Sequence, residues 1–213
     1  DVAERRRGKV RLGCTPLLAS TLLPAALAAF ALDHPGIAVP VTDEPATVLL
    51  ARLRAHELDL VLATVDTADS AFTATLLLDD RLAVVCPATH AWADRCEVAW
   101  HELANESLIL LARGSGLRAL ADRCFAELGL QPKPVQEVTH VATALGLAAA
   151  GLGVAVVPAH AVDRVGVSSV VAIDLTGPEV HRRISMLQAN DRSLSPASDT
   201  MRRHLLEHLG DKR

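Results

Sequence analysis

The segment from Ala142 to Pro158, ATALGLAAAGLGVAVVP, constrains the fold more than any other part of the chain. Small and apolar residues recur at helical spacing until Gly151 and Gly153, and the β-branched run Val154–Val157 follows. A glycine just past a helix adopts the left-handed conformation that ends it, and such a run favours a strand buried on both faces. The segment therefore predicts a helix that turns into a central strand ending at Pro158. In open α/β sheets, ligands bind at that end of a strand.

The rest of the chain repeats this alternation of strands and helices in two sets. The first set has strands at Val10–Gly13, Ile37–Thr42 and Leu58–Thr64, with helices at Leu17–Leu32 and Thr47–Ala55 between them. The second has strands at Leu108–Leu111, Val135–Val138 and Val154–Val157, with helices at Ser115–Gly129 and Thr139–Ala150. Further extended segments are expected at Leu76–Leu78, Leu82–Cys86, Val170–Leu175 and Ile184–Gln188, and a last helix at Pro196–Leu209. Strands that alternate with helices imply parallel sheets with right-handed crossovers.

Composition narrows the class of protein. Half of the 213 residues are apolar, only 2% are aromatic, and the formal net charge is −4. The charge has the wrong sign for a free-standing nucleic-acid binder, and the few aromatics offer no stacking platform for single strands. The one basic cluster is Arg5, Arg6, Arg7, Lys9 and Arg11. We interpret it as a solvent-exposed segment that leads into the first strand.

Cysteine usage and hydropathy indicate a cytoplasmic protein. Cys14, Cys86, Cys96 and Cys124 form no CxxC pair and have no metal-ligand spacing, so neither a disulfide framework nor a metal site is expected. No charge occurs from Leu12 to Leu32. Prolines, hydroxyls and a strand-like start make that stretch a strand plus a helix rather than a membrane span.

Five segments, in order along the chain, resemble the effector-binding domain of LysR-type transcriptional regulators. ALGLAAAGLGVAVVPA resembles that family's aGlGia-lP signature, and GKVRLGCTPLLASTLLPAALAAFALDHPGIAVPV its opening strand, helix and second strand. LRAHELDLVLA resembles the l-x-x-g-x-lD-l-x-i motif, with His56 in the usual glycine place. DDRLAVVCPATHAWA and AELGLQPKPVQEV resemble two further motifs, with Ala91 in place of a proline.

The resemblance implies an α/β fold of the type 2 periplasmic-binding-protein kind, with two Rossmann-like subdomains joined by two crossing segments. Subdomain I would comprise residues 8–80 and 176–213, and subdomain II residues 81–175. It also implies a winged helix-turn-helix upstream of Asp1, with Arg5–Lys9 belonging to the linker. DNA would then be bound through that missing domain alone.

Three loops at the carboxyl ends of strands are expected to converge on a cleft between the subdomains. The first contributes Thr15, Leu17 and Leu18; by the resemblance, Leu17 stands where relatives that bind carboxylates carry a hydroxyl. The Thr15 hydroxyl could contact a ligand or cap the helix. The second loop contributes Glu44, Ala46 and Thr47, with Ala46 at the family's small hydroxyl position.

The third loop belongs to subdomain II. Ser115 and Gly116 are expected to cap a helix, and by the resemblance Leu117 is an apolar ligand contact. Arg113 or Arg118 could pair with a carboxylate or lie on the surface. His140 matches a position that faces the ligand in relatives, or it caps its own helix. These loops predict a small organic effector with an apolar part, and a carboxylate is one candidate.

Catalytic, cofactor and redox interpretations find little support. The chain has no G-x-S-x-G elbow and no H-E-x-x-H. In the peroxide-sensing branch of the family a reactive cysteine stands where Gly116 stands here, and Cys124 has no partner. We therefore expect neither an enzyme nor a cofactor.

The sequence favours a cytoplasmic, effector-sensing domain of a LysR-type regulator. The uncharged helix Leu17–Leu32 is expected to contact a second copy of the chain, as a homodimer or homotetramer, although an ordinary alanine-rich surface would look the same. Effector binding would shift the angle between the subdomains and the packing of the oligomer. The alternative is a stand-alone solute-binding protein of a transporter with the same fold.

Overall fold

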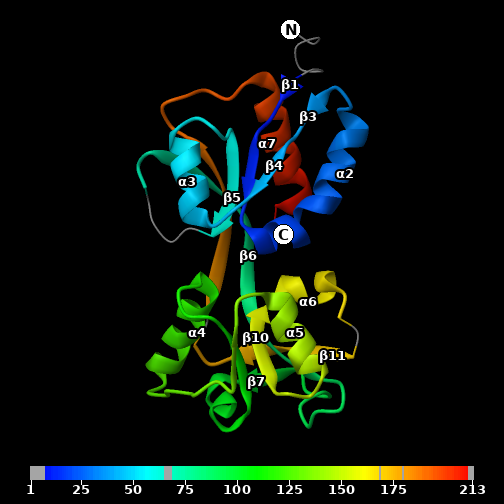
Figure 1. The fold of residues 1–213 in the computed structure, drawn as a ribbon, viewed down its shortest axis with the longest axis vertical. Coiled ribbons are helices and arrows are strands. Elements are labelled where there is room, and N and C mark those ends of the chain that lie inside the picture. The colour runs from blue at the N-terminus through cyan, green and yellow to red at the C-terminus, as the bar shows by residue number, and fades with distance from the viewer. Residues whose placement is uncertain (1–7, 65–68, 168, 179, 211–213) are drawn as a thin grey trace. The chain divides into compact units, whose positions relative to one another are not determined.

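The protein is described from a computed structural model that covers residues 8–64, 69–167, 169–178 and 180–210 (Figure 1). These residues form two compact units. Unit 1 contains the described residues up to Asp79 and from Arg183 onward, and unit 2 contains Asp80–Arg182. Arg5, Arg6 and Arg7 of the basic cluster lie outside the described residues.

Unit 1 is built on four strands, β2 (Leu12–Cys14), β4 (Val41–Asp43), β5 (Leu60–Thr64) and β12 (His181–Ala189), in the order β4-β2-β5-β12. Strand β2 pairs in parallel with β4 and with β5, and β12 runs antiparallel to β5. A separate parallel pair joins β1 (Gly8–Lys9) to β3 (Ile37–Ala38). The parallel β2, β4 and β5 confirm the expected βαβαβ arrangement of the first set.

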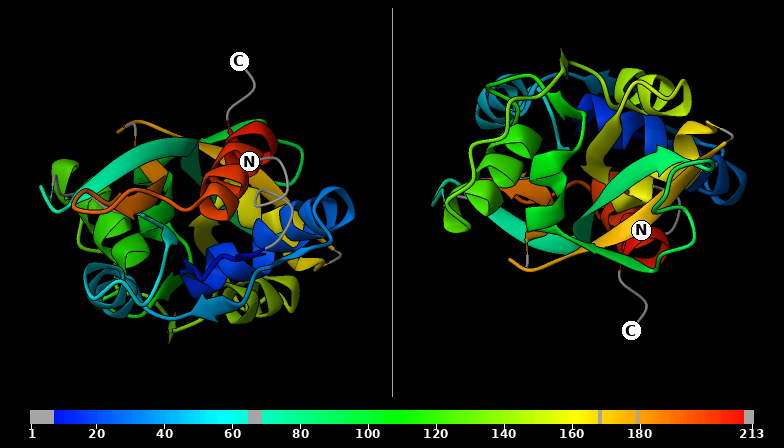
Figure 2. Two further views of the ribbon diagram at one scale, coloured as in Figure 1. Left: turned by 90° about the horizontal axis from the view of Figure 1, so that it is seen from above. Right: turned by 90° about the horizontal axis from the view of Figure 1, so that it is seen from below.

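Alternate residues of β5 pack into two different cores because neighbouring side chains on a strand point to opposite faces. Leu60 and Leu62 join a core with α2 (Leu23–Asp33) and α7 (Pro196–Leu209). Val61 and Ala63 join a second core with α3 (Ala46–Arg54). Helices α2 and α7 lie side by side on one face of this sheet (Figures 1 and 2).

The helix expected from Leu17 to Leu32 is divided into α1 (Pro16–Thr21) and α2. Pro24, in the first turn of α2, has no N–H to donate to the carbonyl of Ser20, and its ring crowds that carbonyl. Leu22 joins the two helices with φ −104°. Within the described part of the chain, no helix is long and apolar enough to cross a membrane.

Unit 2 is built on the parallel strands β8 (Leu108–Leu111), β9 (Gln136–Val138) and β10 (Val154–Pro158). Strand β6 (Phe72–Pro87) pairs antiparallel with β10 and with β11 (Val170–Thr176), which in turn pairs with β7 (Glu97–Ala99). Helix α4 (Gly116–Glu127) shares a core with β8 and β10, and α5 (Val141–Ala149) also contacts both strands. Helix α6 (Ala159–Val165) and the 3-10 helix η2 (Trp100–Asn105) complete the unit.

The turn from α5 into β10 has the predicted form. Helix α5 ends at Ala149, and Gly151 takes φ 77°, so its left-handed backbone closes the helix. Gly153 has φ 151°, and a Cβ built there would lie 2.1 Å from the carbonyl oxygen of Ser107. All five residues of β10 are buried, which confirms the expected central strand.

Strands β6 and β12 carry the chain between the units and are neighbours in the strand order. Strand β6 is one continuous strand of 16 residues where the sequence suggested two extended segments. The chain leaves unit 2 at Arg182, later than the boundary expected after Leu175, because β11 pairs within unit 2 before β12 begins. The assignment of the units as regulatory subdomains, and of a domain upstream of Asp1, stays a prediction.

Candidate functional site

The two loops predicted for unit 1 leave its sheet next to each other. Cys14, the last residue of β2, pairs with Asp43, the last residue of β4. Thr15 N donates to the carbonyl of Leu62 in β5, with 3.1 Å between nitrogen and oxygen. The segments that begin at Thr15 and Glu44 therefore start at the same edge of the sheet, where the carboxyl ends of parallel strands lie.

The start of α1 offers main-chain donors rather than a capped end. The first bond of the helix runs from Ala19 N to the carbonyl of Thr15, so the N–H groups of Leu17 and Leu18 have no partner inside the helix. Thr15 occupies the N-cap position, but its side chain makes no capping bond, so the capping alternative is wrong. Leu17 is half-buried, whereas the Leu18 side chain is fully buried in the core of unit 1. Leu18 can therefore meet a ligand only through its main chain.

The start of α3 has the same character. Pro45 is the N-cap residue and gives no side-chain bond, and its carbonyl accepts from Val48 N and Leu49 N. The N–H groups of Ala46 and Thr47 therefore have no partner inside the helix. Ala46 is half-buried, and Glu44 and Thr47 are exposed.

Thr64 is a further candidate that the sequence analysis did not single out. It is the last residue of β5, the third parallel strand at this edge of unit 1. Among the described residues, its Oγ1 is a buried side-chain oxygen with no hydrogen-bond partner. A buried hydroxyl without a partner is costly, and a polar ligand group would supply the missing bond.

Unit 2 brings its predicted loops together in the same way. Leu111, the last residue of β8, pairs with Val138 of β9, and Ala112 N donates to the Val138 carbonyl over 2.8 Å. Ser115 caps α4 as predicted, since its Oγ accepts from Arg118 N at 3.0 Å. Gly116 at the first position of α4 is exposed, and the half-buried Leu117 packs partly against the core.

Arg118 is a structural residue and not a surface one. Its side chain is 3% exposed; Nε donates to Asp122, and Nη1 donates to Glu137 and to the Leu111 carbonyl. Burial alone would lower the pKa of Arg118, but its bonds to Asp122 and Glu137 raise it overall. The guanidinium thus fixes α4 to β8 and β9, and the exposed Arg113 is the better candidate to meet an anionic ligand.

His140 precedes α5 as its N-cap residue, with an exposed side chain that makes no capping bond. The alternative that His140 caps its helix through the imidazole is therefore wrong. His140 contributes to the start of α5 through its main chain, because its carbonyl accepts from Thr143 N and Ala144 N.

A buried charged cluster lies at the carboxyl end of β10, and no sequence pattern predicted it. Asp80 Oδ2 is 2.6 Å from His160 Nδ1 and 3.5 Å from Arg182 Nη1, and all three side chains are at least nine-tenths buried. Burial lowers the pKa of Arg182, which Asp80 partly offsets. These residues come from β6, α6 and β12, so only the tertiary fold brings them together.

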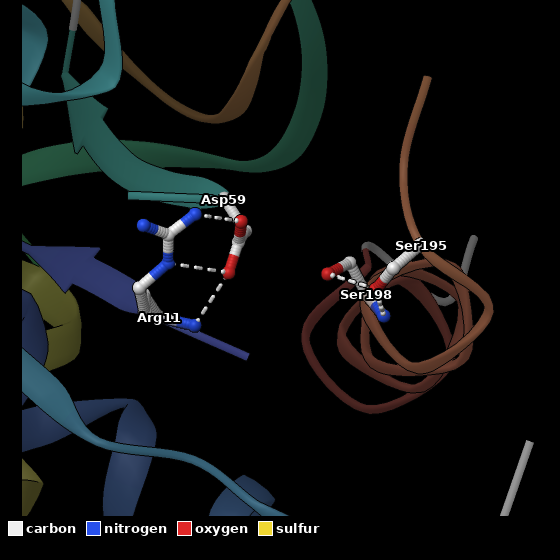
Figure 3. A network of polar contacts seen from close by, with 4 residues as sticks. All are labelled: Arg11, Asp59, Ser195 and Ser198. Carbon is white, nitrogen blue, oxygen red and sulfur yellow. Dashed lines mark hydrogen bonds and ion pairs between the residues drawn. The ribbon is translucent and has the colours of Figure 1, made fainter. Parts of the chain in front are cut away.

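A hollow at the other edge of the unit 1 sheet is too small for an effector. It lies beside Asp59, which accepts from Nε, Nη2 and the main-chain N of Arg11, and beside Ser195 and Ser198 at the start of α7 (Figure 3). Its volume is about 30 Å³, against several hundred for a typical ligand pocket. It has room for ordered water.

Among the described residues, no group of three or more His, Cys, Asp or Glu side chains could hold a metal ion. The two units instead present loops at the carboxyl edges of parallel strands, with main-chain donors and half-buried apolar side chains. Such an arrangement defines a two-unit α/β ligand-binding domain.

Comparison with known proteins identifies the family. The profile of the LysR substrate binding domain matches residues 3–210, and the chain belongs to this family. It is 30% identical over 207 residues to the uncharacterized HTH-type transcriptional regulator YybE of Bacillus subtilis, covering 96% of this chain and 70% of that protein. It is 28% identical over 199 residues to YbhD of Escherichia coli, also an uncharacterized HTH-type transcriptional regulator, covering 93% of this chain and 63% of that one. These relatives do not favour the transporter alternative.

Solved structures confirm the fold. The regulatory domain of Synechocystis CcmR in complex with 2-PG superposes with a TM-score of 0.84 at 21% identity, covering 97% of this chain and 99% of that one. The effector-binding domain of BenM with benzoate gives 0.82 at 24% identity, covering 94% and 91%. The effector-binding domain of QuiR with shikimate gives 0.79 at 22% identity, covering 95% and 97%. The predicted fold of the type 2 periplasmic-binding-protein kind is thus correct.

Proposed function

We propose that this domain binds a small organic acid with an apolar part, through the loops at the carboxyl edges of its parallel strands. The site would use Thr15, Leu17, Leu18, Glu44, Ala46, Thr47 and Thr64 of unit 1, and Ser115, Gly116, Leu117 and His140 of unit 2. The observation that carries the proposal is that the first N–H groups of α1 and α3 have no partner inside their helices, at the edge of the unit 1 sheet where β5 ends with Thr64, whose hydroxyl has no partner among the described residues. Donors of this kind suit carboxylate oxygens.

Two features support the apolar part of the ligand. Leu17, Ala46 and Leu117 are half-buried and hydrophobic, so a ligand that covers them gains free energy from apolar burial. Benzoate and shikimate, bound by two proteins of the same fold, are both carboxylates on a six-membered carbon ring. Glu44 is exposed, which leaves room for a ligand hydroxyl or amine beside it.

The test is a thermal-shift titration with benzoate and shikimate as probes, and benzyl alcohol and glucose as uncharged controls. A ligand that binds the native state raises the melting temperature with the logarithm of its concentration over Kd. We expect at least one of the two acids to do so, and the uncharged compounds to have little effect. A larger shift with glucose than with either acid would contradict the proposal.

Two variants and a control locate the site. Leu17→Asp adds a negative charge beside the proposed carboxylate position, and Thr64→Val removes the hydroxyl while keeping the side-chain shape. Each is expected to weaken binding by about tenfold, the effect of losing roughly 1.4 kcal/mol. Ser193→Ala, at the small hollow of unit 1, is the control and leaves binding unchanged. Equal affinity in all three proteins would show that the acid binds elsewhere.

In the full-length protein we expect a winged helix-turn-helix to bind DNA and this domain to report the effector, because the relatives are HTH-type regulators. Such a protein acts in the cytoplasm, where the DNA is. The domain would bind its ligand without transforming it. An effector with different affinities for two conformations shifts the balance between them, and so changes DNA binding.

We further propose that α2 contacts a second copy of the chain. Pro24, Ala25, Ala28 and Leu32 are exposed on this helix, and the residue exposure of Leu32 is 83%. From Pro24 to Leu32 the exposed positions of α2 carry no charge, and the charged Asp33 comes only at the end of the helix; an uncharged exposed face is typical of an interface. Leu32→Glu is expected to convert a dimer into a monomer in sedimentation equilibrium, whereas Ala126→Glu, at an exposed position of α4, leaves the dimer intact. A wild-type monomer at high micromolar concentration would contradict the dimer.

A further inference from the structure

A buried histidine of unit 1 joins its last helix to its second. His204 lies on α7 and is 5% exposed. Its Nε2 is 2.7 Å from the main-chain carbonyl oxygen of Ala26 on α2. A carbonyl can only accept, so Nε2 carries a proton and donates. One side-chain bond thus joins helices that lie 178 residues apart in the sequence.

Other rings enclose this imidazole. Phe30 of α2, 1% exposed, meets it edge to face with centroids 5.0 Å apart. His208, one turn further along α7, stacks on the His204 ring with 3.8 Å between the ring centroids. His34 packs against the Phe30 ring, with 4.7 Å between those centroids. Phe30 also belongs to the apolar core of unit 1. The His204 ring is therefore held between Phe30 of the apolar core and the imidazole of His208, and His34 lies on Phe30.

We propose that His204 is a proton-sensitive latch: α2 and α7 are held together while its imidazole is neutral, and their contact loosens when it takes up a second proton. The charged form would be an imidazolium in a largely dry site beside His208 and His34. Removing a cation from water is costly unless a partner compensates for it.

The charged and titratable groups around His204 determine the direction of the effect. On α7 itself the neighbour is His208, the end of α2 contributes His34 and Asp33, and β1, which also packs on α7, carries the exposed Lys9. Burial lowers the pKa of His204 below its ordinary value of 6.5; His208 and His34 lower it further, while the Ala26 carbonyl and Asp33 oppose them.

The sign of the pH dependence follows. Once α2 and α7 separate, His204 regains its ordinary pKa, so the open form binds a proton at a higher pH than the closed form does. Opening is therefore favoured as the pH falls below about 6.5, by up to about tenfold per pH unit for one proton. The contact is fully stable above that pH. If α2 also forms the proposed dimer interface, acid would weaken the dimer too, but the latch itself does not depend on the dimer.

The primary test is amide hydrogen exchange of α2 and α7 in dilute protein, corrected for intrinsic rates, between about pH 8 and about pH 5.5. We expect protection in both helices to fall at the acid end, with α3 of the same unit as the internal reference. His204→Gln keeps an N–H donor at the place of Nε2 but cannot titrate, so its protection factors should not change with pH. His208→Gln is the matched control and should retain most of the pH dependence.

Several results would overturn the latch. Unchanged protection of α2 and α7 in the wild type would do so, as would a pH dependence that survives His204→Gln but disappears in His208→Gln. If His204→Gln does not fold, nuclear magnetic resonance titration of the His204 ring in the wild type decides the question. Protonation at or above the ordinary histidine pKa would exclude the latch. If the wild type is a monomer at every pH and the exchange of α2 and α7 still depends on pH, the dimer is refuted and the latch is supported.

Discussion

His56 has a left-handed backbone, with φ 57°, at the position where the family motif carries glycine. It follows Ala55, the C-cap residue of α3, and Glu57 N donates to the Arg52 carbonyl over 2.9 Å, which is the pattern of a helix that ends on a left-handed residue. A side chain in this conformation costs roughly 1 kcal/mol relative to glycine. The motif therefore has a physical reason for its glycine, and this chain departs from it at a cost.

We predict that His56→Gly stabilises the domain by about 0.5–1 kcal/mol, measured by urea denaturation. The variant also loses the ion pair between His56 and Asp191, whose side chains are 38% and 71% exposed, but a pair so exposed contributes little. Asp191→Asn removes the same pair without changing the backbone and should be close to neutral. A His56→Gly protein less stable than the wild type would show that the ion pair outweighs the backbone strain.

Other residues show what sequence reasoning could not reach. Ser115 was identified as a cap because a cap is a local feature, read from the residue and its place before a helix. Asp80, His160 and Arg182 come from three distant segments, and no local pattern marks them. Thr64 ends a predicted strand, but only the structure shows that its hydroxyl is buried without a partner among the described residues.

At the scale of elements, the passage from α5 to β10 was the most predictable part because glycine, small-residue and β-branched patterns agree there. Gly153 is the tightest point, with φ 151° and the Ser107 carbonyl where a Cβ would lie. Val154 N bonds to that same carbonyl over 2.9 Å. The glycine therefore lets β10 approach the residue before β8 closely enough to begin its ladder.

Gly153→Ala is expected to destabilise unit 2 by at least about 2 kcal/mol, since both the φ angle and the contact oppose a side chain. Gly146, seven positions earlier and inside α5, is the matched control: a Cβ there meets nothing within 4 Å. Gly146→Ala should stabilise the protein by about 0.5–1 kcal/mol through helix propensity. Thermal melts of the two variants should move in opposite directions; a neutral Gly153→Ala would show that the approach to Ser107 can relax.

Elements missed by the sequence analysis share a cause. Helix α6 and the pair β7 and η2 have 7, 3 and 6 residues, too few for a periodic pattern to emerge. The break between α1 and α2 was overlooked because the uncharged run around Pro24 looks continuous, and proline is tolerated in the first turn of a helix. Whether an element could be predicted from the sequence depended on its length and composition and not on its importance in the fold.

At the scale of the whole molecule, the two-unit organisation follows from two sets of alternating strands and helices, and the resemblance supplied the rest. Periodicity alone does not say that β6 and β12 each continue from one unit into the other. Strands with mixed exposure, such as β6, give no clean alternation along their length. The resemblance to the family therefore predicted more of the topology than the periodicity of the residues did.

Burial makes three of the four cysteine thiols of this domain unreactive. Burial raises the pKa of the Cys14 thiol to about 12, with help from the charge of Asp43, and that of Cys124 to about 11. Burial likewise raises the pKa of Cys86. The thiolate is the reactive form, so these three thiols are inert in the native protein. Cys96 is exposed.

We therefore predict that a thiol reagent such as dithionitrobenzoate labels Cys96 alone in the native protein, and all four cysteines after denaturation. Cys96→Ser should abolish native labelling without changing the total released by denaturant from the other three. Mild peroxide should produce no disulfide within the chain, because an exposed thiol has no accessible partner thiol in the folded protein. Rapid native labelling of a second cysteine would show that a core opens at equilibrium. Its identity would tell which unit opens, since Cys14 belongs to unit 1 and Cys86 and Cys124 to unit 2.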